Sequence, residues 1–227
     1  MVTPKSRVLQ YDSVLIQRGE LLNVAAVCPK TRALGPGWRS AIWVQGCPFH
    51  CAGCISPEWT TFQPAHSINP VELASTLLAD PEISGLTFSG GEPMQQAAGL
   101  ANLARKARQQ RPINIITYTG YKLEVLKKGI PDRSVFKLLD ETDVLIDGQF
   151  ISALNDNRGM RGSSNQRVHY LTGQLKDFNF EKAPRLSEVQ VLDGQVLMVG
   201  VPEEYLLQAF YRAMWQLESL PLQLVKK

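Results

Sequence analysis

Residues 45–58 read QGCPFHCAGCISPE and contain three of the four cysteines of the chain. Cys47, Cys51 and Cys54 have the spacing C-x3-C-x2-C, so one short loop can present three thiolates to a metal centre. A structural zinc site normally has four protein ligands, whereas a metal centre that binds a substrate keeps one position open. The three cysteines therefore favour an open centre such as a [4Fe-4S] cluster.

The composition predicts one ordinary globular domain. The chain has 227 residues, 44% hydrophobic and 20% charged, and we expect residues 1–227 to form a single domain. The formal charge is only +3, and no run of lysine and arginine is longer than two residues. Proteins that bind nucleic acid usually concentrate basic residues, so we expect no nucleic-acid partner.

Hydropathy predicts a protein that does not enter a membrane. No apolar stretch reaches the roughly 18 to 20 residues that are needed to cross a bilayer. Residues 1–10 are polar and lack the apolar core of a signal peptide. We therefore expect a soluble, cytoplasmic protein with no membrane partner. A reducing compartment also keeps cysteines available as thiolate ligands.

Apolar runs and a helix cap predict the elements around the cysteine loop. Residues 14–16 and 21–27 indicate one or two strands, and residues 40–45 indicate a buried strand that ends at the loop. Farther on, Asn69 and Pro70 are typical of the cap and first position of a helix. We expect this helix to end near residues 80–81.

After the cysteine loop, strands and helices alternate along the chain. The predicted order after the first helix is a strand at 85–88, a helix ending near 110, a strand at 113–118, a helix at 122–128 and a strand at 144–146. This alternation is typical of an α/β fold with a parallel sheet, in which functional groups gather where the strands end. We expect all candidate site residues at that edge.

The alternation ends after residue 150. Residues 155–166 are polar and predict a loop. Residues 189–199 predict a hairpin with a type I′ turn at Asp193-Gly194. Residues 202–218 predict a closing helix. Its expected apolar face consists of Leu207, Phe210, Met214 and Leu217.

A second motif, Ser89-Gly90-Gly91-Glu92-Pro93, follows the cysteine loop. The two motifs together resemble the radical S-adenosylmethionine (SAM) superfamily. The resemblance implies a partial (open) β/α barrel in which Cys47, Cys51 and Cys54 bind a [4Fe-4S] cluster, whose open iron chelates SAM. It also implies reductive cleavage of SAM to a 5′-deoxyadenosyl radical that abstracts hydrogen from a substrate. Because SAM supplies the radical, no side chain is expected to act as a general acid or base.

The same resemblance implies which residues contact SAM. The glycine motif receives the methionine amino group, and similar enzymes contact SAM at the end of the next strand. Asp147 ends the strand after that one, where its carboxylate either contacts the ribose or a cation or is an ordinary strand-end cap. The predicted cofactor-binding residues are Gly90, Gly91, Glu92, Pro93, Thr117, Tyr118, Thr119 and Asp147.

Further motifs resemble the glycyl-radical-enzyme activases, in particular the activating branch of anaerobic ribonucleotide reductase. These are Gly35-Pro36-Gly37-Trp38-Arg39 followed by Gln45-Gly46-Cys47, residues 143–150 and residues 161–167. The resemblance implies a core at about residues 21–167 and a C-terminal hairpin-helix extension at about residues 168–227. It implies a glycyl-radical enzyme as protein substrate and an electron donor such as flavodoxin or ferredoxin.

Two other functions are alternatives. The first is a radical SAM enzyme that modifies a different peptide or a small molecule. The second is a non-catalytic module in which the three cysteines and either His50 or Cys28 hold structural zinc. We favour His50 as a loop residue and Cys28 as a buried apolar thiol. Trp38, Trp43 and Trp59 are expected to pack around the cluster.

The arginines of the polar loop have two interpretations. Arg158, Arg161 and Arg167 can grip the carboxylates of a partner or a nucleotide phosphate. Solvated arginines are the commoner case in loops, so we favour solvation.

Overall fold

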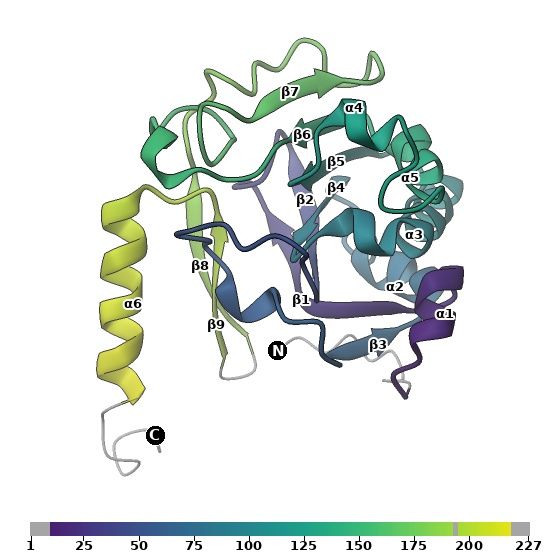
Figure 1. Ribbon diagram of the computed structural model, residues 1–227, viewed down its shortest axis with the longest axis horizontal. Helices are drawn as coiled ribbons and strands as arrows, with labels where there is room; N and C mark the ends of the chain where they lie inside the picture. Colours follow the sequence, from purple (N-terminus) through teal and green to yellow (C-terminus); the bar gives the residue numbers. More distant parts are fainter. Residues whose placement is uncertain (1–9, 193–194, 219–227) are drawn as a thin grey trace.

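A computed structural model describes residues 10–192 and 195–218 of the chain (Figure 1). A seven-stranded sheet has the order β3-β1-β2-β4-β5-β6-β7, and β8 and β9 form a second sheet of two strands. The strands are β1 (Leu22–Thr31), β2 (Trp38–Val44), β3 (His66–Ile68), β4 (Ile83–Gly90), β5 (Asn114–Thr119), β6 (Val144–Asp147), β7 (Arg167–Tyr170), β8 (Ser187–Leu192) and β9 (Gln195–Gly200).

Several of the helices connect strands of the large sheet. Short 3₁₀ helices lie beside the site, and longer α-helices cross from one strand to the next. They are α1 (Ser13–Arg18), η1 (Pro57–Trp59), α2 (Pro70–Leu77), η2 (Pro93–Gln96), α3 (Ala97–Gln110), α4 (Leu123–Leu126), α5 (Val135–Glu141), η3 (Ser152–Leu154) and α6 (Glu204–Glu218). Within the described part of the chain, no helix is both long and apolar enough to cross a membrane.

The centre of the large sheet is parallel, which confirms the predicted α/β class. β2, β4, β5 and β6 pair in parallel, whereas β1, β3 and β7 pair antiparallel toward the edges. Parallel neighbours need long crossover connections, and α2, α3 and the α4–α5 pair lie in those connections. The carboxyl ends of the four parallel strands therefore meet at one edge of the sheet.

One face of the sheet packs against α2, α3 and α5, which lie together on one side of the strands in Figure 1. The predicted start of α2 is confirmed, because Asn69 accepts hydrogen bonds from the backbone N–H groups of Val71 and Glu72. Leu100 and Leu103 on α3 are completely buried against the sheet. Apolar burial on this face provides the main core of the protein.

The other face is covered by segments that follow β6. Met160 and Phe180 pack on Ile116, Val144 and Ile146 of β5 and β6. Near β1 and β2, a second cluster contains Val199 of β9 together with Cys28, Leu34 and Trp43. Successive strand residues alternate between the two cores, as Ile115 and Ile116 do. Phe180 and Val199, which lie beyond residue 169, thus pack against the same sheet as the residues before it.

Arg39 joins three parallel strands from inside the protein. Its side chain is 0% exposed and donates to the Thr87 hydroxyl at 2.7 Å, to the Leu86 carbonyl at 2.5 Å and to the side-chain oxygen of Asn114. Burial lowers the pKa of the guanidinium to about 9. Arg39 therefore links β2 to β4 and β5 through neutral acceptors.

The local structure differs from the expectations at several places. Residues 14–16 lie in helix α1, because Asp12 caps the backbone N–H groups of Val14 and Leu15 and Gly19 ends the helix with a positive φ. The sequence did not predict α5, whose cap residue makes no capping hydrogen bond. It also missed the short strands β3 and β7, and α2 ends at Leu77 rather than near residue 80.

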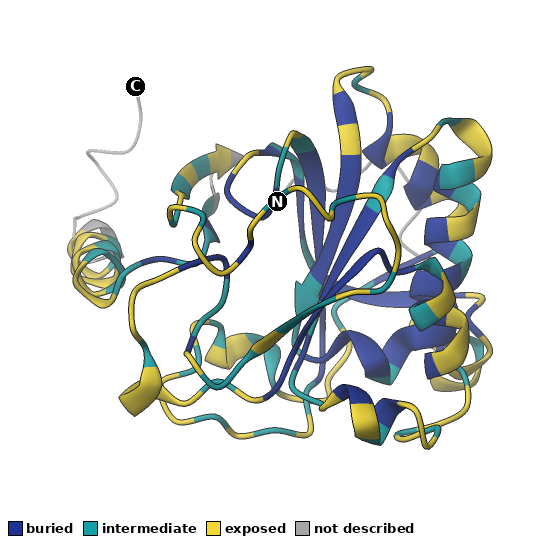
Figure 2. Cartoon of the chain, turned by 90° about the horizontal axis from the view of Figure 1, so that it is seen from above, coloured by how far each residue is buried: buried dark blue, intermediate teal, exposed yellow. Residues whose placement is uncertain are grey.

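The predicted C-terminal hairpin and helix are present as β8, β9 and α6. The turn expected at Asp193-Gly194 and the side chain of Leu217 lie outside the described residues. Leu207, Phe210 and Met214 are only half-buried, and no described side chain of α6 is buried. In Figure 2, α6 stands at one side of the molecule and is coloured as exposed or intermediate. This helix therefore has an apolar side that is incompletely covered.

Candidate active site

The cysteine loop begins where β2 ends, and backbone hydrogen bonds fix its shape. Gly46 N–H donates to the Trp59 carbonyl and Cys47 N–H to the Thr60 carbonyl, both at 2.9 Å. Gln45 adds a side-chain bond to the Thr61 carbonyl at 2.7 Å. These bonds close the loop at its base, beside Cys47, and leave Cys51 and Cys54 on its outer part.

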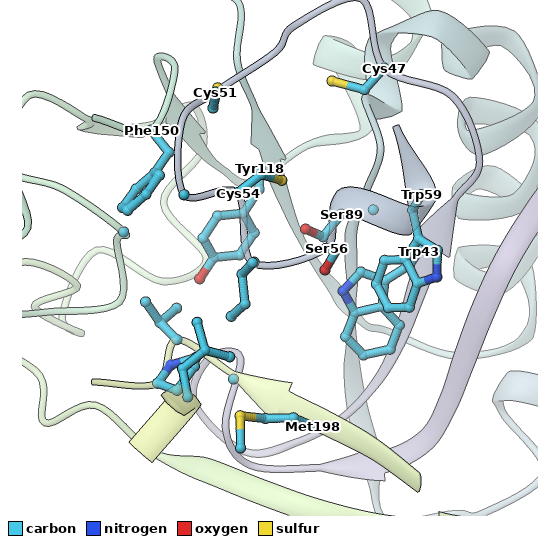
Figure 3. Close-up of a pocket in the computed structure, with 18 of the residues that line it drawn as sticks. Trp43, Cys47, Cys51, Cys54, Ser56, Trp59, Ser89, Tyr118, Phe150 and Met198 are labelled. Atoms are coloured by element: carbon cyan, nitrogen blue, oxygen red, sulfur yellow. The ribbon is translucent and has the colours of Figure 1, made fainter. Parts of the chain in front are cut away.

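Cys47, Cys51 and Cys54 line a single pocket of about 560 Å³. They lie around one side of it, and Met198 lies on the opposite side (Figure 3). All three are half-buried free thiols. Among the described residues, no three His, Cys, Asp or Glu side chains lie close enough to hold one metal ion. A cluster binds each thiolate through a different iron, so its ligands are spread more widely than those of one ion.

The chemistry of these donors fits an iron–sulfur cluster with one open position. The sequence brings three cysteines to the pocket, and neither His50 nor Cys28 is among the lining residues. Burial raises the pKa of Cys47 to about 11 and also raises the pKa of Cys51. The thiolate forms of these side chains therefore need nearby positive charge, which a metal centre supplies.

The glycine motif contacts the cysteine loop directly. Gly91 N–H donates to the Val44 carbonyl at 2.7 Å, and Glu92 N–H donates to the Gly46 carbonyl at 2.8 Å. A Cβ atom on Gly91 would lie 2.3 Å from the Gly46 carbonyl oxygen, which is too close for any side chain. Gly90 has a φ of 123°, a conformation that suits glycine. The two sequence motifs thus form one backbone unit.

Glu92 is buried under this unit. Its carboxyl oxygens accept hydrogen bonds from the Thr119 hydroxyl at 2.7 Å, Gly120 N–H at 2.7 Å and Met94 N–H at 2.9 Å. Burial raises the pKa of Glu92 to about 7, although these three hydrogen bonds act in the opposite direction. Pro93 follows as the first residue of η2 and is buried outside the pocket lining. Glu92 therefore ties the end of β4 to the end of β5.

The three predicted residues at the end of β5 have different positions. Tyr118 and Thr119 line the pocket, and the Tyr118 hydroxyl donates to the Met160 carbonyl at 3.0 Å. Burial raises the pKa of Tyr118 above its ordinary value. Thr117 is completely buried, and its hydroxyl lies 3.0 Å from the hydroxyl of Thr142. Thr117 therefore supports the strand end from behind the pocket.

Asp147 is hydrogen-bonded to other residues of the protein and is not among the residues that line the pocket. It accepts hydrogen bonds from Leu123 N–H at 2.6 Å and from the Arg167 guanidinium at 2.6 and 3.0 Å. Nε2 of His169 lies 3.0 Å from the same carboxylate. Burial alone would raise the pKa of Asp147, but Arg167 and Leu123 outweigh it and lower that pKa. In this arrangement Asp147 acts as a cap at the end of β6.

The C-terminal extension forms a part of the pocket that the sequence did not predict. Arg185 reaches the pocket and donates to Asn155, Asn157 and the carbonyls of Gly159, Arg161 and Gly162. Its burial lowers its pKa. The extension also contributes Val196, Leu197, Met198, Leu207, Phe210 and Tyr211 to the lining. No local motif marks these residues, because only the folded hairpin and helix bring them to the cysteines.

The predictions for the three tryptophans and for Cys28 are confirmed only in part. Trp43 and Trp59 line the pocket with ring centroids 5.8 Å apart, as predicted for residues around the cluster. The expectation for Trp38 is wrong, because its ring lies beside Lys30 and Arg32 at the start of β2. Cys28 is completely buried, and burial raises its pKa to about 12, as expected of a buried thiol.

Two of the three loop arginines are paired. Arg161 binds Asp156 at 2.9 Å, and Arg167 binds Glu124 at 2.8 Å as well as Asp147. Arg158 is exposed, which agrees with the solvated interpretation. Beside them, the Gln166 side chain donates to the Gly148 carbonyl and accepts from Gly162 N–H, both at 2.7 Å. Hydrogen bonds within the polar loop and from Arg185 therefore hold it in place.

A family profile and individual relatives of this chain point to the same kind of protein. The profile of the family described as "4Fe-4S single cluster domain" matches residues 33–169, more than half of the chain. The anaerobic ribonucleoside-triphosphate reductase-activating protein of Vibrio cholerae is 33% identical over 147 residues, which are 61% of this chain and 91% of that protein. The protein of the same name from Escherichia coli K12 is 34% identical over 146 residues, 60% of this chain and 91% of that protein.

A more distant match is the pyruvate formate-lyase-activating enzyme of Clostridium pasteurianum. It is 30% identical over 92 residues, which are 38% of this chain and 39% of that enzyme. The family profile ends at residue 169, before the segment that contributes β8, β9 and α6 to the pocket.

Proposed function

We infer that this chain, which belongs to the radical SAM family of 4Fe-4S single-cluster activating proteins, installs a radical on a glycyl-radical enzyme. The observation that carries this function is the joining of two motifs in one pocket. The cysteine loop and the Gly90–Glu92 turn are held together by the 2.8 Å hydrogen bond from Glu92 N–H to the Gly46 carbonyl. A cluster on the cysteines and a ligand on the turn would be neighbours.

The cluster and SAM supply the redox chemistry. When bound, the [4Fe-4S] cluster would supply the electron for reductive cleavage of SAM into methionine and a 5′-deoxyadenosyl radical, and that radical would take a hydrogen atom from the substrate. We propose Cys47, Cys51 and Cys54 as the cluster ligands. Gly90 and Gly91 have no side chains, which would let the methionine part of SAM approach the backbone closely.

The other predicted cofactor residues have supporting roles in this proposal. Tyr118 and Thr119 would contact SAM from the end of β5, since both line the pocket. Glu92, with Pro93 after it, would hold the glycine turn in place through its hydrogen bonds to Thr119 and Gly120. Thr117 and Asp147, which do not line the pocket, would support the ends of β5 and β6.

The partner proposed for this chain is an enzyme similar to anaerobic ribonucleoside-triphosphate reductase, because three of its relatives are named as activating proteins of that enzyme. A reduced flavodoxin or ferredoxin would supply the electron. We also propose that the sheet curves as a partial β/α barrel around SAM, that residues 1–227 are one domain, and that the enzyme works in the cytoplasm, where its thiols stay reduced.

Anaerobic reconstitution with iron and sulfide tests the cluster. The wild-type protein should bind about four irons per chain, and Cys47→Ala should lose them. Cys28→Ala is the matched control, because Cys28 is buried away from the pocket, and it should keep its iron. With dithionite and SAM the wild-type protein should form 5′-deoxyadenosine. A colourless protein with one zinc per chain would contradict the proposal and support the zinc-binding module.

A second measurement tests the kind of substrate. After incubation with reductant, SAM and an anaerobic ribonucleoside-triphosphate reductase, electron paramagnetic resonance should show the doublet of a glycyl radical on the reductase. Cleavage of SAM without that doublet would favour the alternative of a radical SAM enzyme that modifies a different peptide or a small molecule.

A further inference from the structure

The C-terminal extension forms a groove that opens into the cysteine pocket. One wall is β9, whose Val196, Leu197 and Met198 line the pocket. The opposite wall is α6, which contributes Leu207, Phe210 and Tyr211. The Tyr211 hydroxyl donates to the Ile55 carbonyl at 3.0 Å, so α6 touches the segment next to Cys54. Anything bound in this groove would lie beside the cluster ligands.

The edge of β9 is free to accept another strand. β8 is its only partner strand, and in residues 10–192 and 195–218 no other backbone hydrogen bond reaches β9. Side chains of a strand alternate between its two faces. The pocket is lined by three consecutive residues, Val196, Leu197 and Met198, which cannot all lie on one face of the strand. The edge of β9, with its backbone groups, therefore faces the pocket. An extended peptide can bind such an edge through main-chain hydrogen bonds.

An apolar face continues from this edge. Val196 pairs with Val191 and Met198 with Val189, so these four residues share one side of the hairpin. We call them the hairpin face. Val189 is 56% exposed and Val191 68% exposed. Leu197 and Val199 lie on the opposite side and pack on the second core cluster. A contiguous apolar surface of this kind commonly marks an interaction site.

We propose that β9, the hairpin face and α6 dock an extended, apolar segment of the protein substrate and lay it across the cysteine pocket. The proposal rests on the function proposed above. Three observations select this occupant: a free strand edge fits an extended backbone, the hairpin face fits apolar side chains, and the groove is continuous with the pocket where hydrogen would be abstracted. A second copy of the chain on this face would have no reason to reach the cysteines.

The test uses the full, cluster-loaded chain and an anaerobic ribonucleoside-triphosphate reductase as probe. The double variant Val189→Glu/Val191→Glu places charge on the exposed part of the hairpin face, outside the pocket. Its affinity for the reductase should fall at least tenfold, and the glycyl-radical yield at limiting reductase should fall with it. Iron content and SAM cleavage without reductase should not change. Val71→Glu is the control, because Val71 is 45% exposed on α2 and does not line the pocket.

Hydrogen exchange tests the geometry of docking. A synthetic peptide that contains the radical-bearing glycine of the reductase should slow amide exchange in residues 195–200, and should leave exchange in α2 unchanged. Equal reductase affinity for the wild type and the double variant overturns the proposal. So does a wild type that cleaves SAM but does not bind the reductase.

Two further results are also decisive. If the double variant changes only the oligomeric state measured by light scattering, the hairpin face joins copies of this chain and the proposal is wrong. If the wild type does not cleave SAM, the proposed function fails, yet reductase binding to the two variants still decides the docking site separately.

Discussion

The backbone N–H of Glu92 donates to the carbonyl oxygen of Gly46 at 2.8 Å, and this bond joins the turn after β4 to the start of the cysteine loop. A methyl group at position 91 would enter this junction, 2.3 Å from the Gly46 carbonyl oxygen and 2.8 Å from that of Trp59.

Gly91→Ala should therefore push the cysteine loop away from β4. We expect a loss of about 1 to 3 kcal/mol in the free energy of unfolding, as for other overpacked sites, and fewer irons per chain after reconstitution. Gly173→Ala is the control, since nothing lies within 4 Å of its added methyl group. Equal iron content in both variants would show that the junction tolerates the methyl group.

Glu92 should make stability fall as the pH rises. Its pKa is raised to about 7 by burial, above the ordinary 4.5, so its contribution is complete below pH 4.5 and is lost between 4.5 and 7. A shift of this size corresponds to about 3 kcal/mol. Glu92→Gln cannot ionise, so chemical denaturation across this pH range should give a flatter profile. The same slope in both proteins would assign it to another group.

Asp147 should act in the opposite direction and at lower pH. Arg167, Leu123 and His169 hold its pKa below the ordinary 3.8 against the effect of burial. The stabilisation is therefore present above that ordinary value and disappears as the pH falls through the lowered pKa. Asp147→Asn should lower stability at neutral pH and flatten the acid limb of the unfolding curve. Asp177→Asn, whose side chain forms no hydrogen bond or ion pair with any residue that the structure describes, should leave that limb unchanged.

Arg39→Met should destabilise the protein strongly. The substitution leaves the acceptors of Leu86, Thr87 and Asn114 buried without their donor, which should cost on the order of 3 kcal/mol or more. Arg105→Met, at an exposed arginine that pairs with Glu141, should cost less than about 1 kcal/mol. The difference between their urea midpoints measures the effect, and similar midpoints would contradict this role of Arg39.

Arg185→Lys should loosen the polar loop while keeping the charge. A lysine can replace few of the five donor groups that the guanidinium directs at residues 155–162. We expect faster amide exchange and proteolysis in this loop. Arg158→Lys, an exposed arginine of the same loop, should change neither rate.

Local chemistry accounts for most of what the sequence predicted. The helix cap at Asn69 and the helix that ends near residue 110 are predicted from signals within a few residues, and the structure bears out both. The run at residues 14–16 was misread because three apolar residues fit a strand or a helix, and Asp12 decides for the helix. β3 and β7 have only three and four residues, so they depend on pairing with β1 and β6.

The same distinction holds at the site. The three cysteines and the glycine turn are compact motifs, and the structure brings both to one pocket. Arg185 and Met198 carry no such motif, and they reach the pocket only because β8 and β9 pack beside β1. The contacts of Asp147 could not be predicted from its position at a strand end. Its neighbours Arg167 and His169 come from β7, which the sequence did not predict.

Phe180 and Val199 lie beyond residue 169, where the family match ends, yet both are completely buried against strands of the matched region. The end of the family match at residue 169 therefore does not coincide with a gap in the packing of the protein. Truncation of this protein to the length of its relatives would remove the apolar side chains that cover one face of the sheet. A truncated variant would need polar residues on that face, for example in place of Ile116, Ile146 and Leu34.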